Sequence, residues 1–305
     1  MAYHVPVLLH ECIEGLGIVP NGVYVDLTFG GGGHSRAIVE RLGPHGRLLA
    51  FDRDEEAMAN AIDDPRFTLI RGNFQYFRNF LSIRNIEHVD GILADLGLSS
   101  RHIDSPERGF AFSHNGPLDM RMNRQAQLSA RQVLAQYTEE LLAQLLRTYG
   151  ELDAARPLAR RIAEARTQRE LCEVDDLVAA LEPALPPQRR NKMLAQVFQA
   201  IRIEVNHELD ALRAMLLGAA RTLRVGGRLA VVSYHSLEDR MVKNFMRTGS
   251  PDGNDERDAI TGANPNAPFE QVNRRVITPS PREQADNSRS RSAKLRVGQR
   301  VTHTL

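Results

Sequence analysis

The chain has 305 residues, of which 42% are hydrophobic, and a formal net charge of +1 at pH 7. This length allows one large domain or two ordinary ones, and the apolar share excludes a chain that is disordered throughout. The near-zero charge excludes a globally basic nucleic-acid binder. No apolar run reaches the ~18 residues that a membrane span requires. We therefore expect a globular protein that does not cross a membrane.

The N-terminus and the cysteines indicate where such a protein resides. Residues Met1–Leu16 lack the basic start and the long apolar core of a signal peptide. Cys12 and Cys172 are too few for a disulfide framework, and they form no CxxC or Cys/His spacing typical of metal sites. We expect a reducing, cytoplasmic location and no metal site.

Short apolar runs in the first third of the chain predict buried strands separated by helices. The strands are expected at Val23–Leu27, Arg47–Phe51, Phe67–Ile70 and Val89–Ala94, with helices at Ser35–Leu42 and Glu55–Ile62. Strands that alternate with helices at this spacing favour βαβ units and a parallel sheet.

From about Pro117 to Val205 the pattern becomes all-helical. Ser129 and Gln132 form a capping box, and apolar stripes at helical spacing begin at Leu141 and Leu194. The α/β pattern then resumes, with Gly226-Gly227 turning the chain and strands expected at Arg228–Ser233, Val272–Ile277 and Lys294–Val301. We predict one α/β domain formed by residues 1–116 and 206–305, with a helical domain of residues 117–205 inserted into it.

A glycine-rich segment follows the first predicted strand. The sequence Val23-Tyr-Val-Asp-Leu-Thr-Phe-Gly-Gly-Gly-Gly-His34 passes from a strand ending in Asp26 into four glycines and then a helix. Glycines let the backbone approach a ligand closely, and a helix N-terminus offers free N–H groups. A second acid, Asp52, closes the next strand, where a carboxylate can hydrogen-bond both ribose hydroxyls of a nucleoside.

Two ligand classes compete for this loop. The dinucleotide fingerprint needs Gly or Ala at its third position, and this chain has Ser35 there. Asp26 and Asp52 instead favour the S-adenosylmethionine version of the fold. A glycine run that serves only as a structural turn is the competing explanation.

The fourth predicted strand leads into Asp95-Leu-Gly-Leu-Ser-Ser100. Ligands of open α/β sheets bind at the carboxyl ends of strands, so Asp95 should face the reacting centre. Many amino-group methyltransferases carry an acid or amide here, followed by two prolines and an aromatic residue. This chain keeps the acid without the prolines, and a turn-capping role for Asp95 is the alternative.

Three further segments stand out, namely Arg108–Met122, Phe198–Asn206 and Ser233-Tyr-His-Ser-Leu-Glu-Asp-Arg240. Together with Asp26-x-Thr-Phe-Gly-x-Gly-Gly-His-Ser35 they closely resemble the MraW-type family, the bacterial 16S ribosomal RNA cytosine-N4 methyltransferases. The resemblance covers nearly the whole chain, with the motifs in order and at the family spacing.

The resemblance implies a class I S-adenosylmethionine methyltransferase with a Rossmann-like sheet and an inserted all-α domain. Its substrate would be the N4 amine of a decoding-region cytosine (1402 in the usual rRNA numbering) of 16S rRNA in the small (30S) ribosomal subunit. Carried over by position, the cofactor contacts are Gly32, Gly33, His34, Asp52, Phe74, Asp95 and His102. His102 stands where family members often have Gln, and Tyr234 replaces the usual Phe.

Catalysis is expected from Asp95, His235 and Ser236. The cytosine amine is a poor nucleophile, and Asp95 or an adjacent carbonyl can accept its N–H. His235 and Ser236 follow a strand and can handle a proton or contact the cytosine edge, although an ordinary structural role for His235 competes. No cysteine neighbours Asp95 along the chain, which agrees with a reaction that needs no covalent enzyme intermediate.

The helical insert is expected to bind the substrate. Its Arg189-Arg190-x-Lys192 run is either a solvated face or an RNA contact. Arg108, Asp119 and Arg121 are expected to tie the insert to the core, with a phosphate contact as the alternative for Arg108 or Arg121. Monomer and homodimer both remain open. The rival functions are a methyltransferase acting on DNA or protein, and a non-catalytic ribosome-binding or assembly factor that keeps the cofactor fold.

Overall fold

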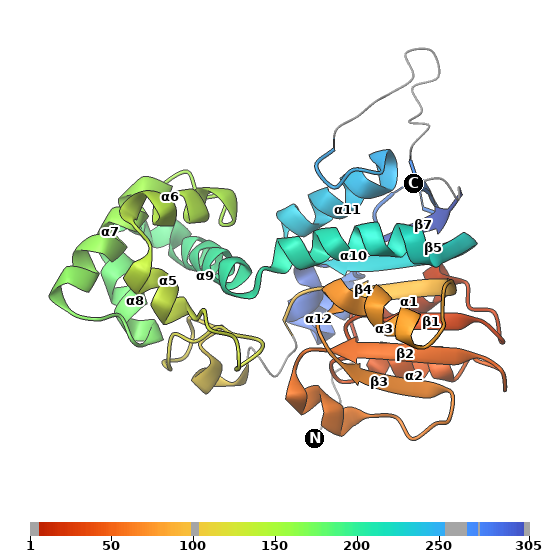
Figure 1. Cartoon of the computed structure of the whole chain (residues 1–305). Helices are drawn as coiled ribbons and strands as arrows, with labels where there is room; N and C mark the ends of the chain where they lie inside the picture. Colours follow the sequence, from red (N-terminus) through yellow and green to blue (C-terminus); the bar gives the residue numbers. More distant parts are fainter. Residues whose placement is uncertain (1–5, 99–103, 254–266, 274, 302–305) are drawn as a thin grey trace, which may run out of the picture. The chain divides into compact units, whose positions relative to one another are not determined.

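The computed structural model describes residues 6–98, 104–253, 267–273 and 275–301, and the chain forms two compact units (Figure 1). The sheet unit comprises Met1–Gly97 with Leu209–Leu305, and the helical unit comprises Leu98–Glu208. The helical unit begins before residue 117, where we expected the insert to start, because Phe110 already packs into its hydrophobic core. In the described ranges, no helix is both long enough and apolar enough to cross a membrane.

The described strands of the sheet unit form one sheet of seven strands in the order β3-β2-β1-β4-β5-β7-β6. Their bounds are β1 Val23–Asp26, β2 Arg47–Asp52, β3 Phe67–Arg71, β4 Val89–Asp95, β5 Leu223–Ser233, β6 Phe269–Gln271 and β7 Lys294–Arg300. β1 pairs with β2 on one side and with β4 on the other, both in parallel. The carboxyl ends of β1 and β4 therefore meet at a topological switch point, where open α/β sheets bind ligands.

The first four predicted strands are confirmed, and the class I methyltransferase arrangement is confirmed with them. The expectation of a parallel sheet holds for β1 to β5 only, because β7 runs antiparallel to β5 and β6 antiparallel to β7. Gly226 and Gly227 lie inside β5 rather than in a turn before it. The Glu55–Ile62 helix is a 3₁₀ helix, η1 (Glu55–Asn60), which the Asp54 side chain caps.

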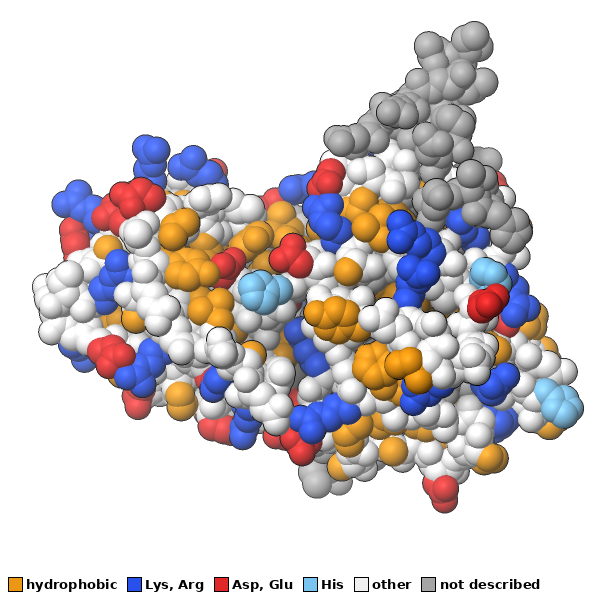
Figure 2. All heavy atoms as spheres, in the orientation of Figure 1, with side chains coloured by type: hydrophobic (Ala, Val, Ile, Leu, Met, Phe, Trp, Pro, Cys, Tyr) orange, Lys and Arg blue, Asp and Glu red, His pale blue; other side chains and the backbone are white. Residues whose placement is uncertain are grey.

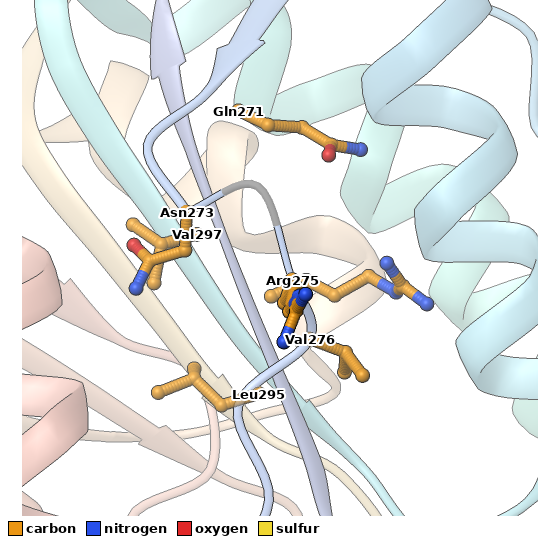
Figure 3. Close-up of a pocket in the computed structure, with 7 residues that line it drawn as sticks. Gln271, Asn273, Arg275, Val276, Leu295 and Val297 are labelled. Atoms are coloured by element: carbon orange, nitrogen blue, oxygen red, sulfur yellow. The ribbon is translucent and has the colours of Figure 1, made fainter.

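The strand predicted at Val272–Ile277 is wrong in its bounds. The paired residues are Phe269–Gln271. Beyond them, the Val272 N–H donates to the Val297 carbonyl of β7 at 3.0 Å, and Ile277 bridges Leu295. A pocket beside β7 is lined in part by Gln271, Asn273, Arg275 and Val276 (Figure 3). None of the predicted cofactor or catalytic residues lines this pocket.

Helices cover both faces of the sheet because successive strand residues alternate between two apolar cores. Leu48, Leu93 and Val232 join α1 (Leu9–Leu16) and α2 (Gly33–Val39) on one face. Leu49, Ile92 and Val231 join α3 (Phe77–Ile83), α10 (Glu208–Thr222) and α11 (Ser236–Thr248) on the other. The short α12 (Pro281–Asp286) precedes β7. α1 was not predicted from the sequence.

The helical unit is held by one hydrophobic core. Its α-helices include α5 (Ala130–Gln136), α6 (Glu139–Thr148), α7 (Ala155–Gln168), α8 (Val174–Leu181) and α9 (Arg190–Asn206). The predicted capping box of Ser129 and Gln132 is present at the start of α5. The α9 stripe that begins at Leu194 is buried, whereas Leu141 at the start of the α6 stripe is 47% exposed.

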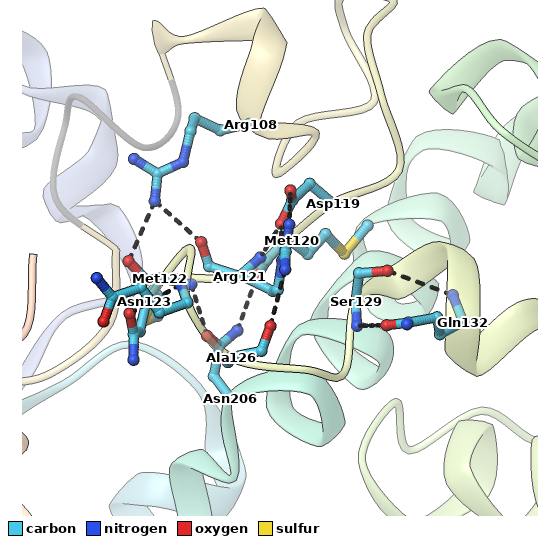
Figure 4. Close-up of polar contacts among 11 residues, drawn as sticks. Arg108, Asp119, Met120, Arg121, Met122, Asn123, Ala126, Ser129, Gln132 and Asn206 are labelled. Carbon is cyan, nitrogen blue, oxygen red and sulfur yellow. Dashed lines mark hydrogen bonds and ion pairs between the residues drawn. The ribbon is translucent and has the colours of Figure 1, made fainter.

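Arg108, Asp119 and Arg121 form hydrogen bonds within the helical unit (Figure 4), and the expected tie between the insert and the core stays a prediction. The Arg108 guanidinium donates to the carbonyls of Arg121 and Met122. Arg121 forms a two-pronged ion pair with Asp119. These residues therefore shape the segment that leads into α5.

Candidate active site

The glycine loop is held in shape by its own backbone and by neighbouring strands. Gly30 and Gly32 have φ values of +51° and +76°, which favour glycine, and Gly32 directly precedes α2. A Cβ added at Gly33 would lie 2.1 Å from Cγ of Pro6. The N-terminal segment and the loop are therefore in close contact, which is possible because Gly33 has no side chain.

Asp26 braces the loop from inside the protein. Its Oδ2 accepts a hydrogen bond of 2.6 Å from the Ser35 hydroxyl, and its Oδ1 accepts one of 3.1 Å from the backbone of Thr28. Burial raises the pKa of this carboxyl to about 6. Asp26 thus joins the end of β1 to the first turn of α2, which is a structural role.

Asp52 ends β2 at the edge of the same loop. Its Oδ2 accepts a hydrogen bond of 2.8 Å from the Gly30 N–H, and its Oδ1 accepts one of 2.8 Å from the Asp54 N–H. Phe74 follows β3, the next strand, in η2 (Phe74–Tyr76), and its ring is half-buried. The two predicted cofactor contacts therefore occupy the carboxyl ends of adjacent strands.

Asp95 ends β4 beside this loop, and the two oxygens of its carboxyl group face different residues. Its Oδ1 accepts a hydrogen bond of 2.8 Å from the Tyr234 hydroxyl, and its Oδ2 lies 3.8 Å from Nδ1 of His34. Its backbone N–H donates to the Thr28 hydroxyl at 2.6 Å. Burial raises the pKa of Asp95 to about 7, while the Tyr234 hydrogen bond lowers it.

His34, in the first turn of α2 directly after the loop, is buried and neutral. Its Nε2 lies 3.2 Å from the Val7 carbonyl oxygen, which can only accept, so Nε2 carries the ring proton. Burial lowers the pKa of the imidazole to about 4. His34 therefore joins the loop to the N-terminal segment without contributing a charge at neutral pH.

His235 and Ser236 begin α11 at the carboxyl end of β5. His235 is the N-cap residue, and its Nδ1 accepts the Glu238 N–H at 3.4 Å. Its Nε2 lies 3.2 Å from Oε1 of Glu238. Ser236 is exposed. The geometry gives His235 a capping role, and proton handling by either residue stays a prediction. His102 lies outside the described residues.

Three contributors to the site were not singled out by their sequence motifs. In the sequence, Tyr234 stands out only as a replacement for Phe, Thr28 only as part of a motif, and Cys12 only as one of two cysteines. Burial raises the pKa of the Cys12 thiol well above its usual range, and the negative charge of nearby Asp95 raises it further. A cysteine therefore lies near Asp95 in the fold, although none is near it in the sequence. Because its thiol stays protonated, Cys12 does not act as a nucleophile.

This arrangement fits a nucleoside with a charged tail. A Cβ built at Gly30 or Gly31 meets no atom within 4 Å, so the described structure leaves open space over the loop. The first turn of α2 has no side-chain cap on its N–H groups. Gly32 and Asp52 lie beside Gly30 and Gly31 at this part of the loop, where the Asp52 carboxylate accepts the Gly30 N–H.

Comparison with known proteins agrees with this geometry. The model of the MraW methylase family matches residues 1–301. The Ribosomal RNA small subunit methyltransferase H of Bacteroides thetaiotaomicron is 51% identical over 300 residues, covering 98% of each chain. The protein of that name from Flavobacterium johnsoniae is 50% identical over 301 residues, covering 99% of each.

Solved structures with a similar course of the chain share little sequence with it. An rRNA methylase from Streptococcus thermophilus is 12% identical with a TM-score of 0.41, covering 98% of this chain and 99% of its own. A Streptococcus mutans protein in complex with SAH is 12% identical with a TM-score of 0.44, covering 98% and 100%. The family match over almost the full length, with half-identical relatives from end to end, assigns this chain to the MraW methylase family, with S-adenosyl-L-methionine as its cofactor.

Proposed function

We propose that this protein methylates 16S ribosomal RNA of the small subunit, at the N4 amine of a cytosine in the decoding region. The relatives that are half identical to it carry the name of a small-subunit rRNA methyltransferase. The observation that carries the choice of an amine is the Asp95 carboxyl at the switch point, with Oδ1 bonded to Tyr234 and Oδ2 facing His34.

The proposed reaction is an in-line displacement in which N4 of cytosine forms a bond to the methyl carbon as the sulfur–carbon bond breaks. Bound S-adenosylmethionine supplies a methyl group that is already activated by its positive sulfur. Asp95 accepts one N–H of the amine at Oδ2, which turns the nitrogen lone pair toward the methyl group. The amine proton is released to Asp95 and then to water. Orientation of this kind lowers barriers by roughly 7–11 kcal/mol in favourable cases.

The remaining residues hold the reactants. Gly32, Gly33 and His34 line the cofactor side in this proposal, Asp52 binds the ribose, and Phe74 lies beside the adenine. The target base has to leave its stack to reach Asp95, at a cost of a few kcal/mol that is smaller in single-stranded RNA.

We assign substrate binding to the helical unit. Arg189 and Lys192 are exposed on it, whereas Arg190 is ion-paired with Glu182 at 2.8 Å. Basic and acidic side chains are interspersed on the visible face of both units rather than gathered by sign (Figure 2). We therefore expect RNA to be recognised by a few cations and by shape, with a modest dependence on salt.

Mass spectrometry of 16S rRNA tests the proposal. Cells that lack the protein should yield a decoding-region cytosine without its N4 methyl group, and the native gene should restore it. Asp95→Asn should bind the cofactor yet fail to restore the mark. An unchanged cytosine in the deletion strain would refute the proposal. Purified enzyme given naked 16S rRNA or 30S particles then shows which of them is the substrate.

A further inference from the structure

Tyr234 and Asp95 come from neighbouring strands and meet at the carboxyl edge of the sheet. β4 and β5 run parallel with Asp95 opposite Val232, so the residue two positions after Val232 reaches the Asp95 side chain. The Tyr234 hydroxyl donates to Oδ1 of Asp95 at 2.8 Å. One oxygen of the proposed proton acceptor is therefore held by a phenol that belongs to the protein.

The other oxygen of Asp95 keeps its capacity to accept. Oδ2 faces Nδ1 of His34 at 3.8 Å, and that nitrogen presents a lone pair because Nε2 holds the ring proton against the Val7 carbonyl. His34 thus cannot donate to an ionised Asp95. The side chain of Asp95 is 23% exposed.

Other groups around Asp95 oppose its ionisation. Burial has the largest effect on its pKa, and the charges of Asp26 on β1 and Glu238 on α11 raise it further. His34 on α2 is neutral, and the Cys12 thiol on α1 stays protonated. The Tyr234 hydrogen bond is the interaction that counteracts them. The pKa of Tyr234 itself is raised well above its usual value, so the phenol remains a donor.

Tyr234 is fixed in position from two sides. Its backbone N–H donates to Oε2 of Glu238 at 2.9 Å. Its ring packs on Gly97, where an added Cβ would lie 3.3 Å from the ring. The phenol therefore meets Asp95 in one orientation.

We propose that Tyr234 is a positioning residue of this enzyme, whose hydroxyl favours the ionised form of Asp95 and leaves Oδ2 to face the methyl acceptor. This inference rests on the proposed function, in which Asp95 accepts an N–H of the cytosine amine. It has a consequence that needs no RNA. An ionised Asp95 attracts the cationic sulfonium of S-adenosylmethionine but not the neutral sulfur of SAH, so the ratio of the two affinities reports the charge of Asp95.

Calorimetric titration of S-adenosylmethionine and of SAH between pH 6 and 9 tests the inference. For the native enzyme the affinity ratio should rise with pH and level off. Tyr234→Phe keeps the ring and removes the donor, so the midpoint of this rise should move up by about one pH unit. At pH 7 the ratio and kcat/KM should then fall about fivefold, and both should recover near pH 9.

Two variants serve as controls. Tyr24→Phe removes another buried hydroxyl, which accepts the Val19 N–H at 2.8 Å, and should leave the midpoint unchanged. Asp95→Asn should abolish the pH dependence of the ratio, with or without Tyr234→Phe. Unchanged SAH affinity shows that the Phe variant is folded. An unmoved midpoint in Tyr234→Phe would overturn the inference, whereas a moved midpoint with no rRNA methylation would overturn the proposed function alone.

Discussion

Glu283, near the end of the chain, accepts a hydrogen bond of 2.7 Å at Oε1 from the backbone N–H of Leu8. Leu8 precedes α1 with a φ of +53°. The neighbouring Val7 carbonyl accepts a hydrogen bond from Nε2 of His34, which follows the glycine loop. α12 therefore fastens the N-terminal segment, and that segment contacts the loop. Two hydrogen bonds, Leu8 to Glu283 and His34 to Val7, therefore connect α12 to the start of α2 through the N-terminal segment.

The first prediction concerns this fastening. Glu283→Ala leaves the Leu8 N–H without its partner, and we expect a loss of about 1–2 kcal/mol in unfolding free energy, together with weaker cofactor binding. Urea unfolding and calorimetry measure the two effects. Glu283→Gln keeps an acceptor oxygen and should lose less than half as much. Equal losses in both variants would show that the charge, not the hydrogen bond, matters.

The second prediction separates two neighbouring glycines. Gly33→Ala forces its Cβ against Pro6, so we expect a loss of about 1–3 kcal/mol in the unfolding free energy of the cofactor-free protein. Gly31→Ala faces open space and should change that stability by less than about 0.5 kcal/mol. Thermal unfolding of both variants without cofactor makes the comparison. Equal stability of the two variants would contradict the close contact with Pro6.

The third prediction concerns stability and pH. The pKa of Asp95 is raised from 3.8 to about 7 on folding, so the folded protein binds more protons than the unfolded chain between these values. The contribution of Asp95 to the stability therefore falls as pH rises through this window, whereas the lowered pKa of His34 acts in the opposite direction below pH 6.5. Asp95→Asn removes the effect, and its stability relative to the native enzyme should increase by about 2 kcal/mol between pH 5 and pH 8. Urea unfolding at both pH values measures this difference, and a gap that shrinks toward pH 8 would contradict it.

The fourth prediction concerns His34. Burial lowers the pKa of its imidazole to about 4, so the ring should stay neutral, with the proton on Nε2, throughout the neutral range. Nitrogen chemical shifts of the histidine ring, followed by NMR from pH 8 to 5, test this. Exposed His10 in the same spectra serves as the comparison, because its ring meets solvent. A His34 that protonates near pH 6.5 would show that the ring is hydrated.

Local patterns predicted the framework of the site. Apolar runs and glycines identified β1 to β4, and the acids that end these strands, Asp52 and Asp95, lie at one sheet edge as expected. Such features depend on neighbouring residues in the chain. The chemistry around Asp95 depends instead on strand register, because Tyr234 is 139 positions away. The hydrogen bond between Glu283 and Leu8 joins residues 275 positions apart, so no local sequence pattern predicts it.

The errors have the same origin. The Val272–Ile277 segment carries strand-forming residues, but the ladder with β7 is formed by Phe269–Gln271. Within the segment, Val272 bonds Val297 and Ile277 bridges Leu295, without a continuous ladder among its described residues. The predicted domain boundary at residue 117 divides the Arg108–Met122 motif. Phe110 of this motif packs into the core of the helical unit, and a one-dimensional pattern cannot show to which core a loop belongs.

The last prediction concerns Asn206, which ends α9 and joins it to the Arg108 segment. Its Oδ1 accepts the Met122 N–H at 2.8 Å, and its Nδ2 donates to the Met120 carbonyl at 2.8 Å (Figure 4). Asn206 is buried, so Asn206→Ala leaves a donor and an acceptor of the backbone without partners. We expect a loss of about 2–4 kcal/mol in the unfolding free energy. Asn191→Ala, at an exposed position of the same helix, should cost less than about 0.5 kcal/mol. Because Ala has a higher helix propensity than Asn, propensity cannot cause a loss in either variant. A loss confined to Asn206→Ala would therefore identify the buried bonds as the cause, and similar losses in both variants would contradict it.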